Sequence, residues 1–177
     1  SLIHRSAPGP PSRRSWPGAA AARGLLARGG SAVQRQAYIP GIIDGSAQWA
    51  FAFAEAGSGY ELNRIAASAA PSDGGYVLSG RKIAVLNGHC ADHIIVTARV
   101  AGSDALSLFI VDATAAGVSR ESFVAVDGSR GAHLDFDRVS LGVDSVLGEV
   151  DAGLPLALAA IDSAIVAIGA ESLGAMQ

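Results

Sequence analysis

Two glycine-containing turns carry the residues best suited to chemistry. Residues 51–61 read Phe-Ala-Phe-Ala-Glu-Ala-Gly-Ser-Gly-Tyr-Glu, an aromatic strand that runs into a Gly-x-Gly turn. Such a turn lets the backbone approach a flat or phosphorylated ligand closely. A dinucleotide-binding fold would need a third glycine, an immediate helix and alternating strands and helices, whereas the residues that follow favour strands. An ordinary hairpin turn is the competing interpretation.

Two further segments lie downstream of this turn. Residues 80–88 read Gly-Arg-Lys-Ile-Ala-Val-Leu-Asn-Gly, an apolar strand that ends in Asn-Gly, a strong turn pair. Residues 91–99 read Ala-Asp-His-Ile-Ile-Val-Thr-Ala-Arg, another strand. Each segment alone indicates only a strand and a turn. Their proximity to residues 51–61 makes them candidates for one shared site.

Four neighbouring side chains, His89, Cys90, Asp92 and His93, resemble a metal-binding cluster. They lead directly into a strand, where the two histidines would lie about 13 Å apart at roughly 3.3 Å per residue. A zinc ion holds its ligands at about 2 Å, so we expect turn and strand-entry residues and no metal site.

No catalytic signature stands out elsewhere. Glu55 and Glu61 are acids near the first turn, but a catalytic acid needs a perturbed environment and a partner, and the sequence shows neither. The sequence contains no Ser-His-Asp signature and no phosphate loop ending in Gly-Lys-Ser/Thr.

The elements that must position these residues are mostly strands. Residues 49–147 contain short apolar or β-branched runs separated by turns, which favours an antiparallel barrel or sandwich. The expected strands are residues 49–53, 76–78, 82–86, 93–98, 106–111, 132–136 and 139–141. Residues 25–43 suggest a helix capped by Ser31 and ended by Pro40 and Gly41. Residues 151–177 suggest a helix capped by Asp151. The predicted fold class is therefore α+β, mainly β, with an antiparallel barrel or sandwich flanked by helical segments.

Composition excludes several classes of protein. The chain is 50% hydrophobic and 16% charged, which is typical of a globular protein, and its net charge of -3 favours neither nucleic acid nor an anionic membrane. The single cysteine, Cys90, excludes an internal disulfide framework and suits a reducing compartment. Arginine outnumbers the one lysine, Lys82, twelve to one, and this bias suggests a GC-rich genome.

Two segments could belong to a targeting peptide or a membrane span. Residues 1–24 are rich in Pro, Gly, Ala, Ser and Arg, and we interpret them as disordered or non-native, with a flexible linker or a transit peptide as alternatives. Residues 154–170 are apolar enough to suggest a membrane span. Asp162 lies at their centre, where insertion of an acid costs about 2.5–3.5 kcal/mol, so we expect no span.

The ordered series of motifs resembles the acyl-CoA dehydrogenases. That family carries an aromatic-x-x-Thr-Glu-Pro-Gly-x-Gly-Ser-Asp segment, then Gly-x-Lys, an aromatic residue, a short apolar step and Asn-Gly, then Ala-Asp, an apolar strand and Ala-Arg. Residues 51–61, 80–88 and 91–99 present those pieces in that order. The resemblance extends over roughly residues 25–177, where the last helix is similar to the opening helix of the family's C-terminal domain.

The resemblance implies FAD as cofactor, with the two glycine-containing motifs against its isoalloxazine ring. The implied cofactor-binding residues are Phe51, Phe53, Ala54, Gly59, Tyr60, Ala84, Val85 and Leu86. Tyr60 and Asp162 are the implied substrate contacts, and no catalytic residue is expected in this chain. The implied base and the distal FAD contacts come from a region after Gln177.

Several positions depart from the family pattern. Ala54 and Leu86 replace hydroxyl residues, Ala84 replaces an aromatic, and Ile165 stands where an arginine is expected. Tyr60 would crowd the usual acyl path. A branch acting on bulky or ring-bearing acyl-CoAs and a subunit that has lost its chemistry are both compatible with these changes.

The expected organisation has four parts. These are a disordered or non-native segment (1–24), the end of an N-terminal helical domain (25–48), the middle β-domain (49–150) and a truncated first C-terminal helix (151–177). The expected function is oxidation of an acyl-CoA to 2,3-enoyl-CoA, with this part alone inactive. The alternatives are a non-catalytic partner subunit of a heteromeric dehydrogenase and an unrelated β-sandwich binding module. The resemblance implies a homo- or hetero-oligomer and an electron-transfer acceptor protein, in a bacterial cytoplasm or, in a eukaryote, a mitochondrion.

Overall fold

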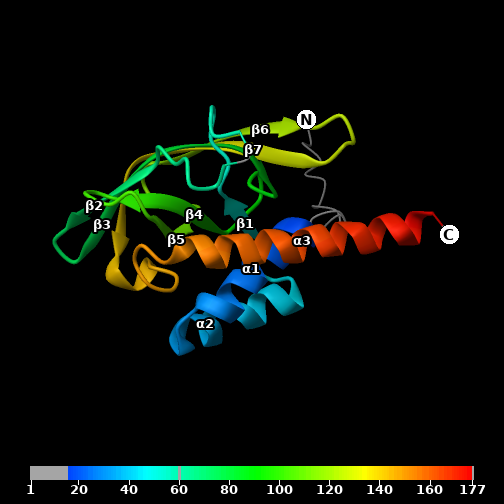
Figure 1. The fold of residues 1–177 in the computed structure, drawn as a ribbon, viewed down its shortest axis with the longest axis horizontal. Coiled ribbons are helices and arrows are strands. Elements are labelled where there is room, and N and C mark those ends of the chain that lie inside the picture. Colours follow the sequence, from blue (N-terminus) through cyan, green and yellow to red (C-terminus); the bar gives the residue numbers. More distant parts are fainter. Residues whose placement is uncertain (1–15, 60, 177) are drawn as a thin grey trace, which may run out of the picture.

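The computed structural model describes residues 16–59 and 61–176 of the chain, and it contains a sheet flanked by helices (Figure 1). The elements, in chain order, are α1 (Trp16–Gly29), α2 (Ala32–Asp44), β1 (Trp49–Ala52), β2 (Ser68–Ser72), β3 (Gly75–Leu86), β4 (His93–Val100), β5 (Leu106–Asp112), β6 (Val118–Val124), β7 (Arg130–Gly142), the short 3-10 helix η1 (Val143–Ser145) and α3 (Gly153–Ala175). The expected α+β class with flanking helices is confirmed.

The sheet is mixed and curls into a half-barrel. Its strand order is β1-β4-β2-β3-β7-β6, and β5 also pairs with β4. Most pairs are antiparallel, but β1 and β2 both run parallel to β4. The alternation of residues along each run did not reveal these two parallel pairs. Both pairs are compatible with parallel pairing because long stretches of chain, and no tight hairpin, connect β1 and β2 to β4.

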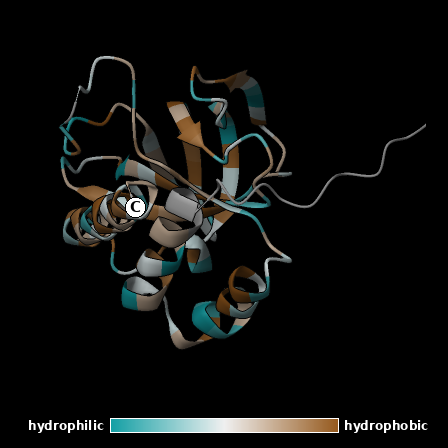
Figure 2. Ribbon diagram, turned by 90° about the vertical axis from the view of Figure 1, so that its right-hand side faces the viewer, coloured by the Kyte–Doolittle hydropathy of each residue, from teal (hydrophilic) through white to brown (hydrophobic). Residues whose placement is uncertain are grey.

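The core lies between the sheet and the helices. Every residue of β1 is buried, because β4 pairs with this strand and α1 packs against it. Trp49, Phe109 and Leu25 are among the largest fully buried side chains, and they come from β1, β5 and α1. Figure 2 shows the hydrophobic residues concentrated along the strands and on parts of the helices. This core fixes the sheet, which in turn positions the two glycine-containing motifs.

Helix α1 begins within residues 1–24, the segment that the sequence suggested is disordered or non-native. The helix begins at Trp16, and both Ala21 and Ala22 are buried in the core. The end of this segment therefore packs on the core through the small side chains of Ala21 and Ala22. The expectation for residues 1–15 lies outside the described residues.

Helix α2 starts as expected and ends later than expected. Ser31 forms a capping box with Gln34, which confirms the predicted cap. Pro40 lies inside the helix and does not end it; the helix continues to Asp44 and stops at Gly45, whose φ of 78° closes it in the left-handed conformation. Because the segment around Pro40 is partly exposed, water can satisfy the carbonyl that the proline leaves unpaired.

Strand boundaries differ from the sequence expectation in three places. β2 and β6 were not expected as strands, because most of their residues are polar or small and exposed. β3 runs without a break from Gly75 to Leu86, where two shorter strands were expected. β7 likewise joins two expected strands, and it accommodates the junction at Arg138, whose φ is 53°.

Helix α3 begins at Gly153 and projects beyond the sheet (Figure 1). Asp151 does not cap it, contrary to the sequence expectation. Its φ is 65°, and it instead exchanges hydrogen bonds with Ser107, whose Oγ accepts from the Asp151 amide at 2.8 Å. The left-handed backbone directs Asp151 toward β5 and away from the first turn of the helix.

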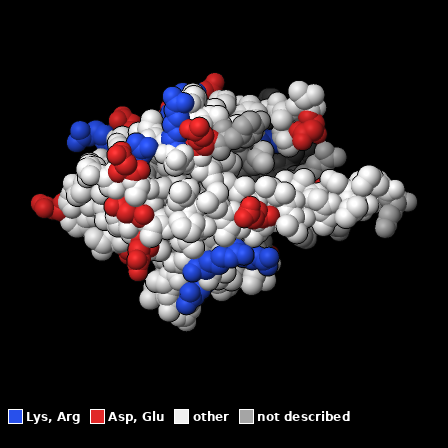
Figure 3. All heavy atoms as spheres, in the orientation of Figure 1, with Lys and Arg blue, Asp and Glu red and all other residues white. Residues whose placement is uncertain are grey.

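The same helix is long and apolar enough to cross a membrane by length and composition alone. Large hydrophobic side chains are exposed along its second half, namely Ile165, Val166, Ile168 and Leu173, and Met176 just after the helix is exposed as well. Figure 3 shows its projecting end nearly free of charge, whereas basic atoms form a band over the helices beneath it. The expectation that the chain has no membrane span therefore stays a prediction.

Candidate functional site

The two glycine-containing motifs meet where β1 ends and β3 passes it. The Ile83 amide donates to the Ala54 carbonyl oxygen at 2.9 Å, which joins the segments directly. The sequence expectation that they lie together is met at this contact. Phe53 is 37% exposed and Leu86 is 46% exposed, and Ala84 is exposed as well. The junction therefore carries accessible apolar side chains from both segments.

Two of the expected contact residues are buried instead. Phe51 and Val85 retain only 6% and 2% exposure. The Phe51 ring lies 5.1 Å from the ring of Phe53, so it supports the exposed ring from below. Val85 anchors β3 in the core, between the exposed Ala84 and Leu86.

The Gly-x-Gly turn is built by a serine. Ser58 Oγ accepts from the Glu55 amide at 3.3 Å and donates to the Glu55 carbonyl at 2.9 Å. Gly57 and Gly59 both have positive φ, 86° and 57°, which explains the glycines. A Cβ at either glycine would meet no atom within 4 Å, so the surface beside the turn is open. Tyr60 lies outside the described residues.

A buried ion pair lies directly behind the junction. Lys82 Nζ donates to Glu55 Oε1 at 2.6 Å and to Thr97 Oγ1 at 2.7 Å, and Lys82 has no exposed surface. The Glu55 carboxylate also accepts the amides of Ala66 and Ala67, at 2.6 Å and 3.1 Å. The ion pair thus connects the turn after β1 to β3, to β4 and to the loop before β2.

The pKa values of both partners are lowered. Burial lowers the pKa of Lys82 to about 8, although Glu55 acts in the opposite direction. Burial acts to raise the pKa of Glu55, but the hydrogen bond and charge of Lys82, with the two amides, outweigh it. Both groups are charged at neutral pH. The sequence had indicated neither a partner for Glu55 nor burial of Lys82.

The turn after β3 is held by side chains that the sequence did not single out. Asn87, with a φ of 63°, donates from Nδ2 to the Trp49 carbonyl at 3.0 Å. Arg120 on β6 donates to four backbone carbonyls between 2.9 and 3.3 Å, those of Gly88, His89, Ala91 and Ala113. No spacing in the sequence relates Arg120 to this turn, because only the β6–β7 pairing brings it there.

The residues considered for metal binding serve other contacts. Burial, together with Arg130 and Arg120, lowers the pKa of His89. Burial and Asp92 raise the pKa of the Cys90 thiol. The His93 ring packs 4.7 Å from Trp49. In the part of the chain that the structure describes, no group of three or more His, Cys, Asp or Glu side chains could hold a metal ion.

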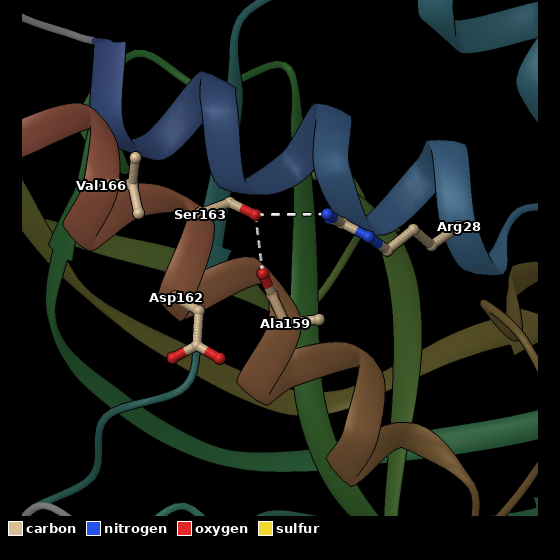
Figure 4. A pocket seen from close by; sticks show the side chains of 5 residues that line it. All are labelled: Arg28, Ala159, Asp162, Ser163 and Val166. Atoms are coloured by element: carbon tan, nitrogen blue, oxygen red, sulfur yellow. Dashed lines mark hydrogen bonds between the residues drawn. The ribbon is translucent and has the colours of Figure 1, made fainter.

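Asp162 lies in a different place. It lines an open hollow of about 450 Å³ between α1 and α3, together with Arg28, Ala159, Ser163 and Val166 (Figure 4). Arg28 donates to Ser163 Oγ at 3.3 Å, while the Asp162 carboxylate points away from it (Figure 4). None of the residues at the motif junction lines this hollow. The substrate contact expected for Asp162 stays a prediction.

The comparisons with known proteins bear on this site. A family model described as "Acyl-CoA dehydrogenase, middle domain" matches residues 50–139, which include both motifs and the ion pair. The chain belongs to the acyl-CoA dehydrogenase family. Mitochondrial isovaleryl-CoA dehydrogenase of Oryza sativa subsp. japonica is 31% identical over 158 residues, covering 86% of this chain and 39% of the relative. The chain thus spans about two fifths of the length of this relative.

Solved structures show the same fold. Butyryl-CoA dehydrogenase of Megasphaera elsdenii aligns with a TM-score of 0.82 and 24% identity, over 89% of this chain and 43% of that one. A glutaryl-CoA dehydrogenase of Mycobacterium smegmatis in complex with FADH2 aligns with a TM-score of 0.77 and 22% identity, over 84% of this chain and 39% of that one. Acyl-CoA dehydrogenases are FAD-dependent oxidoreductases.

The residues present fit one side of a flavin ring. Phe53, Ala84 and Leu86 offer exposed apolar surface, and the small residues at 54 and 84 let a flat ring approach the backbone. Neither alanine nor leucine offers a side-chain hydrogen bond. Any polar contact between a flavin and Ala54, Ala84 or Leu86 must therefore come from the backbone of these residues.

Proposed function

We propose that this chain forms the flavin-facing part of an FAD-dependent acyl-CoA dehydrogenase that oxidises an acyl-CoA to its 2,3-enoyl form. The observation that carries the proposal is the junction of the two motifs, linked by the Ile83 amide and the Ala54 carbonyl and lined by exposed apolar groups. When bound there, FAD would supply a hydride acceptor at its N5 atom. The chain's own part is to seat the ring against Phe53 and Leu86 and to exclude water.

The base that removes the substrate α-proton is assigned to a region beyond this chain. The carboxylate nearest the junction, Glu55, is engaged by Lys82 and two backbone amides, and its lowered pKa makes it a poor proton acceptor. The proposal includes an acyl-CoA substrate, a homo- or hetero-oligomer and an electron-accepting protein partner, in a bacterial cytoplasm or a mitochondrion.

A non-catalytic partner subunit is the second candidate. It is favoured by the side chains at positions 54 and 86, where an alanine and a leucine provide no hydroxyl to orient a flavin. Such a subunit would retain the fold and the junction without turning over substrate.

The experiment compares Leu86→Asp with Val143→Asp in the full-length protein. Both side chains are exposed, 46% and 68%, so neither substitution buries a charge, but only Leu86 lies at the junction. The wild type should purify yellow, and acyl-CoA should bleach the flavin absorbance under anaerobic conditions. Leu86→Asp should weaken FAD binding about tenfold or more, and Val143→Asp should not.

The outcomes separate the candidates. Bleaching by an acyl-CoA supports the enzyme, whereas bound FAD that no acyl-CoA reduces supports the partner subunit. If the full-length protein binds no FAD, both candidates fail. The 177-residue chain alone should lose flavin on desalting, because one wall does not supply the convergent groups that a binding site needs.

A further inference from the structure

The flavin-facing part of β3 contains an irregularity in its pairing with β7. Lys82 pairs with Leu134, and Val85 pairs with Ala132, so that Ile83 and Ala84 stand opposite a single residue, His133. Two residues facing one is the arrangement of a β-bulge, which re-aims the side chains that follow it. The bulge lies immediately before Val85 and Leu86 and includes Ala84.

Neither backbone amide of the bulge donates to a backbone carbonyl of β7. The Ile83 amide donates to the Ala54 carbonyl, and the Ala84 amide donates to Nδ1 of the His133 side chain at 3.2 Å. Ala84 has a φ of 51°, which a residue with a Cβ rarely adopts, so this conformation has to be held by specific contacts. The imidazole supplies the acceptor that the facing strand does not provide.

The His133 ring is itself held in place. It stacks on Phe123 with ring centroids 5.2 Å apart and an angle of 29° between the planes. Phe123 in turn lies over Gly131, where a Cβ would come within 2.6 Å of its ring. On the strand beside it, Glu121 pairs with His133 in register, and its carboxylate is engaged by Arg81 at 2.9 Å. Nδ1 must be unprotonated to accept the amide hydrogen.

We propose that His133 is a positioning residue, whose imidazole fixes the bulge at Ala84 and thereby the orientation of Ala84 and Leu86 toward the flavin. This inference rests on the proposed function for its consequence, since the flavin is the group that the segment would face. The positioning itself concerns this chain alone. His133 does not touch the reacting atoms; it acts through the Ala84 amide.

Two substitutions separate the acceptor from the ring. His133→Phe keeps an aromatic ring for stacking on Phe123 but has no acceptor. His133→Asn gives up the ring but places an amide oxygen close to the Nδ1 position. Glu121→Gln is the matched control, because it changes the neighbouring charge and leaves the imidazole intact. All three are made in the full-length protein, with FAD as the titrated ligand and hydrogen exchange followed in the peptide covering residues 81–88.

His133→Phe should increase exchange in this peptide, shift the flavin absorbance bands and weaken FAD binding about tenfold, which corresponds to 1.4 kcal/mol. His133→Asn should recover most of the affinity, and Glu121→Gln should resemble the wild type. The inference is overturned if His133→Phe leaves exchange unchanged, if exchange rises while FAD affinity and spectrum do not change, or if His133→Asn is as impaired as His133→Phe. If no variant and not even the wild type binds FAD, the proposed function fails and the flavin consequence with it, while the exchange data still report whether His133 holds the bulge.

Discussion

Replacing Lys82 by methionine tests the buried ion pair in depth. Lys82→Met keeps an unbranched side chain in the core but leaves the Glu55 carboxylate buried without its cation. Breaking one half of a buried pair costs about 3–5 kcal/mol of unfolding free energy. The amides of Ala66 and Ala67 remain to solvate the carboxylate, so we expect a value near the lower end, about 3 kcal/mol.

The control is the next residue toward the N-terminus. Arg81 carries the same charge and pairs with Glu121 and Asp135, but its side chain is 51% exposed. Exposed pairs contribute about 0.2–1 kcal/mol, so Arg81→Met should cost no more than that. Unfolding in urea, followed by circular dichroism, measures both variants against the wild type. If the two variants lose the same free energy of unfolding, the argument that burial makes the Lys82 ion pair stabilising is refuted.

The cost of Lys82→Met should also depend on pH. In the wild type the pKa of Glu55 is lowered, so its contribution is present above the unfolded-state pKa and is lost as pH falls through the folded-state value. In the variant, acid neutralises the buried carboxylate and removes the unpaired charge. The stability difference between the two proteins should therefore shrink between pH 7 and about pH 4. A difference that stays constant over this range would contradict the argument.

Three further predictions concern the packing around the site. Gln34→Leu removes the donor that ties α2 to two carbonyls at η1, at 2.7 and 2.9 Å, and should cost about 1–3 kcal/mol in urea unfolding. Gly131→Ala should destabilise the protein, because the new Cβ meets an aromatic ring at 2.6 Å. Gly169→Ala, at an open position of α3, should stabilise it by about 0.5–1 kcal/mol. Thermal melting should therefore show a lower melting temperature for the first variant and a higher one for the second. Leu25→Ala, in the fully buried part of α1, should cost about 2–5 kcal/mol, while Arg23→Ala on the exposed side of the same helix should stay within about 0.5 kcal/mol.

Local patterns predicted the fold class, whereas the joining of the two motifs was implied by the resemblance to the acyl-CoA dehydrogenases. The alternation of apolar and polar residues and the turn pairs predicted most strands, and Ser31 predicted the start of α2. The sequence did not indicate that α1 packs on the core at Ala21 and Ala22, since these side chains are small. It also could not show that Pro40 lies within a helix, because the exposed surroundings tolerate the missing hydrogen bond.

The residues of the motif junction were predicted less completely, because their burial and their partners depend on tertiary contacts. Phe53, Ala84 and Leu86 lie at the surface of the junction, as the resemblance implied, but Phe51 and Val85 are buried beneath it. The partners that hold the junction come from distant positions: Glu55 meets Lys82 across strands, and His133 meets the bulge only through the pairing of β3 with β7. Such contacts follow from register, and no spacing along the chain encodes them.

The parallel pairing of β1 with β4 also has a consequence for the time course of folding. Trp49 lies beside His93, 44 positions later, so β1 has no hydrogen-bonded neighbour until β4 has been made. At a synthesis rate of about 5–20 residues per second, the wait is roughly 2–9 s. During this interval β2 and β3 are also synthesised, and β3 contacts β1 in the folded structure. Helix α1, which packs on β1 in the folded structure, is synthesised before it and is therefore available to cover this aromatic strand before β4 exists.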